Sequence, residues 1–190
     1  MKVGLTALRA VVGAVFFAHG AQKLFGWFGG PGLEGTAKGF DSMGMKPGKR
    51  NAVVAGAAEA GGGALFALGF ATPVAAAATI GVMDQAIRKV HISKGFFATQ
   101  GGYEFNLVLI AAAVALAETG PGKLSVDEAL GLKLHGPLWA VAALGAGLAG
   151  PRLLERMQPD PEPEAEAAGV ANGEPRLTRE PAPEPVGSAA

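Results

Sequence analysis

Several ionisable side chains interrupt the apolar stretches of this sequence, and their spacing brings some of them together. His19, Gln22 and Lys23 are three and four residues apart, so on a helix they share one face. The imidazole of His19 could relay protons or bind a ligand, since it titrates near neutral pH, or it could bond a carboxylate purely for packing. Lys23 could join such a site or extend its ammonium group to water.

Glu59 is the only charged residue in the second apolar stretch, residues 51–70, and it lies near the middle. An unpaired carboxylate in such surroundings would become protonated or attract a cation. Arg9 precedes Lys23 by fourteen residues, nearly four helical turns, so the two are roughly in line. The expected partners of Glu59 are therefore Arg9, His19 and Lys23.

A second polar stripe follows on the third apolar stretch. Asp84 and Arg88 are four residues apart and His91 is three further on, which fits an intrahelical ion pair with an interfacial histidine as well as a binding site. Glu104 opens the fourth stretch, where the helix dipole favours a carboxylate. The predicted binding residues are Arg9, His19, Gln22, Lys23, Glu59, Asp84, Arg88, His91 and Glu104.

Other chemistry is excluded or unsupported. The chain has no cysteine, which excludes disulfides, thiol catalysis and cysteine-ligated metals. The three histidines lie on different segments without zincin spacing, and no nucleotide-binding glycine motif is present. Zero net charge argues against a nucleic-acid binder. No catalytic residue and no metal site are therefore predicted.

These polar residues sit in five apolar stretches that predict an all-α, polytopic membrane helix bundle. Charged residues make up 17% of the chain, below the roughly 25% usual for soluble domains. A membrane-crossing helix needs about 20 residues, which the fourth stretch barely reaches. A soluble bundle with alanine-rich helices is disfavoured, because the charges cluster between the stretches. The stretches are residues 3–25, 51–70, 72–90, 104–118 and 135–154.

Small residues and prolines support helices that pack closely. The run Gly61–Gly63 and the pair Ala58 and Gly62 favour close backbone approach, with a cofactor groove as the alternative. Pro73 and Pro137 stand where helices are expected to begin.

Charge is distributed unevenly along the chain. Nine lysines and arginines fall in the first loop, the third loop and the segment just after the fifth stretch, against four elsewhere, so the former side is predicted to be cytoplasmic. If the fifth stretch does not cross the membrane, the C-terminal tail is predicted to lie on the outer side instead. Residues 158–190 hold seven of the 13 prolines and a net charge of −5, and are predicted to be a disordered spacer or an acidic arm for a basic partner.

Five segments together resemble the DoxX family of small bacterial and archaeal membrane proteins, over about Leu5 to Leu130. Residues 56–72, GAAEAGGGALFALGFAT, resemble that family's G-x-x-E-x-x-G-G pattern, and Asp84 and His91 stand where the family has an acid and a histidine. The other matching segments are RAVVGAVFFAHGAQKLFGWFGG from Arg9, then GGYEFNLVLI and GPGKLSVDEAL.

The resemblance implies a four-helix membrane domain, here residues 1–133, in a bacterial cell membrane. Residues 134–157 would add a hydrophobic helix and residues 158–190 the acidic tail. The family is named after a subunit of a quinone-linked oxidoreductase system, and other members are linked to assemblies that handle oxidative or thiol stress.

The function expected first is an integral membrane subunit of a redox or quinone-associated assembly, with a buried polar site between helices. The alternatives are a non-catalytic scaffold that recruits a cytoplasmic partner and a small-solute permease component. The expected partners are the lipid bilayer and other membrane or cytoplasmic redox proteins, without nucleic acid. Whether the chain is an enzyme, whether it forms homo-oligomers and which cofactor it binds stay open; a quinone would suit such a site.

Overall fold

The computed structural model describes residues 3–157, and these form helices without any strand. The all-α fold predicted from the five apolar stretches is therefore confirmed; the tail, residues 158–190, lies outside the described residues. Two shorter helices join the five long ones. The α-helices are α1 (Val3–Phe25), α2 (Gly32–Ser42), α3 (Gly48–Leu68), α4 (Thr72–Ala86), α5 (Glu104–Thr119), α6 (Val126–Ala129) and α7 (Pro137–Arg156).

Three of the helices, α1, α3 and α7, are long and apolar enough to cross a membrane. The 16 residues of α5 span about 24 Å, less than a hydrocarbon core of ~30 Å. The 15 residues of α4 continue into a π-helical turn, Ile87–His91, which lengthens this element. Short 3₁₀ turns, Trp27–Gly29, Ile92–Lys94 and Ala98–Gln100, occupy the connections.

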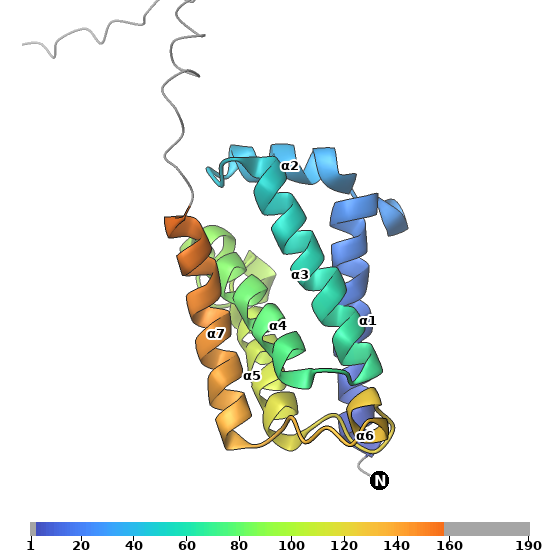
Figure 1. Cartoon of the computed structure of the whole chain (residues 1–190). Coiled ribbons are helices and arrows are strands. Elements are labelled where there is room, and N and C mark those ends of the chain that lie inside the picture. Colours follow the sequence, from blue (N-terminus) through green and yellow to red (C-terminus); the bar gives the residue numbers. More distant parts are fainter. Residues whose placement is uncertain (1–2, 158–190) are drawn as a thin grey trace, which may run out of the picture. The chain divides into compact units, whose positions relative to one another are not determined.

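The long helices alternate in direction along the bundle (Figure 1). The connection that contains α2, the connection between α4 and α5 and the end of α7 lie at one end, which we call the α2 end. The start of α1, the α3–α4 turn and the loop with α6 lie at the other, the α6 end. The first and third loops, which both carry an excess of basic residues, thus share an end.

Glycines set the close packing of α1 on α3. A Cβ atom on Gly20 would lie 2.3 Å from the backbone nitrogen of Ala60, and one on Gly63 would lie 2.3 Å from that of Phe17. Neighbouring Gly62 instead faces α4, where its Cβ would lie 3.1 Å from that of Ala78. Within the glycine run, Gly63 therefore packs on α1 and Gly62 on α4. This is the close packing predicted for the run.

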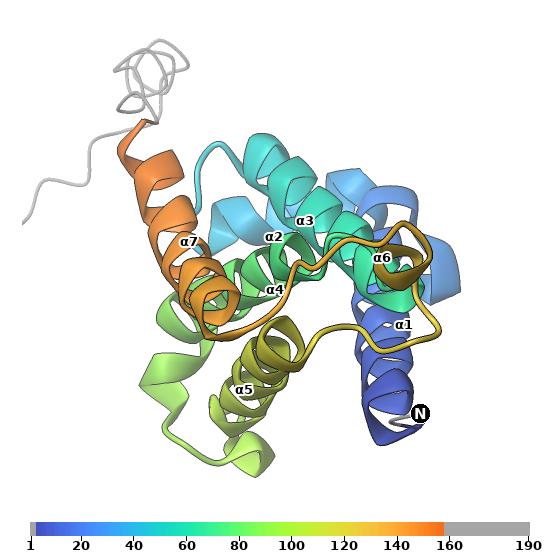
Figure 2. The ribbon, with the colours of Figure 1, turned by 60° about the horizontal axis from the view of Figure 1, so that its bottom comes forward.

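The centre of the bundle is α4, which packs against α3, α5 and α7 (Figure 2). The core contains Phe16 of α1, Phe66 of α3, Ile80 of α4 and Leu116 of α5, all of them buried. The last of the five long helices, α7, joins this core through Ala140 and Ala143 and packs on α4 and α5.

Candidate functional site

An ion pair between α1 and α3 lies at the centre of the predicted site. The ammonium group of Lys23 donates to Oε2 of Glu59, whose side chain is only 5% exposed, while that of Lys23 is 25% exposed. Of the three partners expected for Glu59, the structure selects Lys23. Lys23 is near the end of α1, whereas Glu59 is near the middle of α3. The two side chains lie at the same level because α3 begins beyond the end of α1 at the α2 end.

A cavity of about 280 Å³ adjoins this ion pair. It lies between α1, α3, α4 and α5, and apolar side chains form most of its wall. We call it the ion-pair cavity. Its polar lining comes from His19, Lys23, Glu59, His91 and Asn106; its apolar lining comes from Val15, Phe16, Val82, Met83, Ala86, Phe105 and Leu109.

The cavity brings together four residues predicted from the sequence, including both histidines of the two polar stripes. His91 lies in the π-helical turn, and its Nδ1 is 2.6 Å from the carbonyl oxygen of Gly101. A carbonyl only accepts, so Nδ1 carries the proton of this bond, and an Nε2 without a proton would be an acceptor. His19 is exposed on α1 and has no hydrogen bond to any residue from 3 to 157.

Asn106 was missed in the sequence, although an amide within the apolar run of α5 is itself a signal. Its side chain is buried and donates to Sδ of Met83 on α4, at 3.3 Å. Because Asn106 and Met83 both line the ion-pair cavity, this contact joins α5 to α4 within the cavity wall.

A second cavity, of about 190 Å³, lies against the same ion pair. Lys23, Glu59, Val82 and Ala86 line both cavities, and Phe40 of α2 lines only the second. The ion pair is thus bordered by two separate spaces rather than sealed in the core.

Asp84 and Arg88 form the predicted intrahelical ion pair, with Nε of Arg88 2.9 Å from Oδ2 of Asp84, but neither lines the ion-pair cavity. Instead they join α4 to α7. Both terminal nitrogens of Arg152 reach the Asp84 carboxylate, at 3.0 and 3.3 Å, and Glu155 accepts from Arg88 at 3.3 Å. Arg152 and Glu155 were not predicted as site residues, because they lie at the end of the fifth apolar stretch and just beyond it, where they resemble ordinary loop charges.

Arg9 lies apart from the site, near the α6 end. Its guanidinium donates to the carbonyl oxygens of Phe66, Ala67 and Leu124, at 3.2, 3.0 and 2.6 Å. It therefore binds the last carbonyls of α3 and ties the α6 loop to them. Asp127 of that loop accepts from the backbone nitrogen of Ala71, at 2.9 Å, and caps the start of α4.

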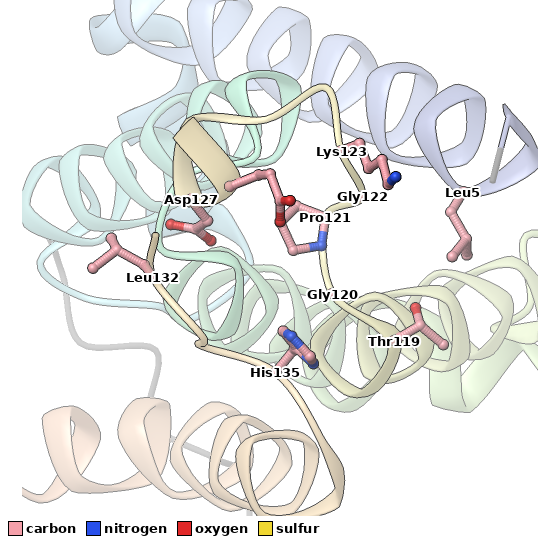
Figure 3. A pocket seen from close by; sticks show the side chains of 10 residues that line it. Leu5, Thr119, Gly120, Pro121, Gly122, Lys123, Asp127, Leu132 and His135 are labelled. Carbon is pink, nitrogen blue, oxygen red and sulfur yellow. The ribbon is translucent and has the colours of Figure 1, made fainter. Parts of the chain in front are cut away.

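The same loop borders another cavity, of about 380 Å³ (Figure 3). Lys123 and His135 lie around it, together with Asp127. The segment GPGKLSVDEAL, prominent in the sequence, therefore has a structural task here: it supplies Leu124 to Arg9 and Asp127 to α4.

Gln22 and Glu104 also lie outside the cavity. The Gln22 amide is 3.5 Å from the carbonyl oxygen of Phe28, and the Glu104 carboxylate accepts from the backbone nitrogen of Ala98 at 2.7 Å. Both therefore hold loops at the α2 end. Among residues 3–157 no three histidine or carboxylate side chains are placed to bind a metal ion.

Two comparisons with known proteins found similar sequences. The sequence model of the DoxX family matches residues 4–92. A protein of Bacillus subtilis (strain 168) named "Putative oxidoreductase CatD" is 32% identical over 126 residues, which cover 66% of this chain and 86% of that relative. No solved structure matches the chain. The chain belongs to the DoxX family of membrane proteins.

Proposed function

We propose that the protein is a membrane subunit of a redox assembly and that its ion-pair cavity binds the head group of a quinone. The observation that carries this proposal is the Lys23–Glu59 ion pair, held beside an apolar cavity that two histidines also line. Ligand sites of this kind combine mostly apolar walls with a few convergent polar groups.

The donors and acceptors of the cavity suit a ring that carries oxygen atoms at opposite ends. The Lys23 ammonium can donate to a quinone carbonyl, and Nε2 of neutral His91 can accept from a quinol hydroxyl. The aromatic ring would lie against apolar side chains such as Phe16 and Phe105. These residues thus supply hydrogen bonds to both the oxidised and the reduced head group.

The protein itself would bind and orient the quinone and exchange protons with it. A bound quinone supplies the redox chemistry, since its reduction to the quinol takes two electrons and two protons. The chain has no cysteine, so a dithiol of its own cannot supply the electrons. In this proposal a redox partner within the assembly supplies them. His19 is placed for proton exchange because it is both exposed and part of the cavity wall.

The route for a lipophilic ligand follows from the helix packing. The helices α1 and α5 make few contacts with each other, and Val15 of α1 and Phe105 of α5 both line the cavity while remaining exposed. A ligand dissolved in the bilayer could therefore enter between them. In this proposal the protein lies in the cell membrane with its α2 end in the cytoplasm, as the basic residues of that end favour.

Replacing His91 by phenylalanine is expected to raise the Kd of a short-tailed quinone about tenfold, because one hydrogen bond to the head group is lost. Equilibrium titration of purified protein in detergent measures this change. His135→Phe is the matched control, since His135 lines the cavity at the α6 end. Unchanged binding by His91→Phe, or equal weakening by His135→Phe, would contradict the proposed site.

A further inference from the structure

A small groove lies between the first turns of α3 and the last turns of α7. Both helices pack on α4 rather than on each other (Figure 2), and Gln85 of α4 lines the groove between them. Val54 of α3 and Pro151 and Leu154 of α7 form its apolar walls, with Gln85 of α4 between them. Val54 and Leu154 are each 42% exposed, so this apolar strip faces outward from the bundle.

At the α2 end the groove widens into a polar cavity of about 200 Å³. Lys46 from the α2–α3 connection and Lys89 from the π-helical turn after α4 line this cavity, together with Glu155 of α7. Arg50, in the first turn of α3, lines the narrow part just beside it. An apolar strip with Arg50 beside it therefore leads into a space lined by two further cations and one carboxylate.

The carboxylate pairs with only one of these three cations, Lys89. Glu155 is already bound by Arg88 and by Lys89, each at 3.3 Å, and the neighbouring Asp84 is bound by Arg88 and Arg152. This network has three cations for two acids. No salt bridge joins Lys46 or Arg50 to an acid within residues 3–157, so the groove keeps an excess of positive charge.

We infer that this groove binds one anionic phospholipid. The phosphate lies among Lys46, Arg50 and Lys89, and an acyl chain follows the strip formed by Val54 and Leu154. Charge complementarity selects the phosphate, and continuity with an outward-facing apolar strip selects a lipid over a soluble anion. Basic pockets between helices at the cytoplasmic face commonly hold such head groups, and the α2 end carries the basic excess.

The test compares lipid binding by the full chain and its variants in a neutral detergent, by native mass spectrometry with added phosphatidylglycerol or phosphatidylcholine. The wild-type protein should retain phosphatidylglycerol preferentially. The variant Lys46→Gln/Arg50→Gln should lose about 30-fold in affinity, since each basic residue near a lipid surface contributes roughly fivefold. The control Lys38→Gln/Lys49→Gln removes the same charge outside the groove and should bind as the wild type does.

A steric variant separates the lipid from a free anion. Val54→Trp keeps every charge but fills the apolar strip, so it should also weaken phosphatidylglycerol binding. The inference is overturned if phosphatidylcholine binds equally well, if both double variants lose affinity alike, or if inorganic phosphate competes as effectively as the lipid. It is also overturned if the full chain binds lipid only after Glu162, Glu164 and Glu166 are replaced by glutamine, because the acidic tail is then the occupant.

Discussion

Replacing Lys23 by methionine is expected to destabilise the helix bundle by about 3–5 kcal/mol, because the Glu59 carboxylate then stays buried without a cation. Glu59 lies on α3 between the two cavities, and its side chain is 5% exposed. Glu59→Leu should cost less than Lys23→Met, since the Lys23 side chain is 25% exposed and its ammonium group can extend to water. Equilibrium unfolding in detergent measures both changes.

Two further variants identify the cause of this loss. The double variant Lys23→Met/Glu59→Leu should recover most of the stability, because no unpaired charge remains buried. Lys49→Met breaks the exposed pair with Glu34, where the side chains are 68% and 74% exposed, and should cost under about 1 kcal/mol. A double variant no more stable than Lys23→Met would show that the ion pair is not the source of the effect.

Arg9→Met is the second change with a large expected effect, about 3–4 kcal/mol. Arg9 is 3% exposed and donates to three carbonyl oxygens, and hydrogen bonds from a charged donor each contribute about 1.5–3 kcal/mol without adding fully. The variant should also make residues 120–136 more sensitive to proteolysis, because Leu124 loses its bond to Arg9. Unfolding curves and limited proteolysis together measure the change.

A conservative variant tests whether charge or geometry matters at this position. Arg9→Lys keeps the charge but lacks the planar fork that reaches three carbonyls, so it should recover only part of the stability. Lys123→Met, at an exposed position of the same loop, should leave stability almost unchanged. Full recovery with Arg9→Lys would contradict the bonding scheme and leave charge alone as the explanation.

The long helices could be predicted because an apolar run is a local property of the chain. The first stretch, residues 3–25, coincides with α1, and the fourth begins at Glu104 as α5 does. The helix α2 was not predicted, because its sequence, GLEGTAKGFDS, is rich in glycine and polar residues. Its packing on α3 and α1, rather than its own composition, stabilises it.

The polar contacts depended on how the helices fit together, which spacing alone does not determine. Lys23, rather than Arg9 or His19, pairs with Glu59 because Gly20 and Gly63 fix how α1 lies on α3. The partners of Arg9 are backbone carbonyls, which no residue pattern reveals. Asp84 was assigned to the same site as Glu59, but α7 brings Arg152 to it instead.

The proposed quinone site is tested most directly by photoaffinity labelling in membranes with an azido-quinone, followed by mass spectrometry of the peptides. The account predicts labels on residues 15–23, 82–91 and 105–109, which contribute to the wall of the ion-pair cavity, and loss of these labels when unmodified quinone is added. Labelling confined to residues 119–135, around the cavity at the α6 end, or labelling that unmodified quinone does not reduce, would contradict it.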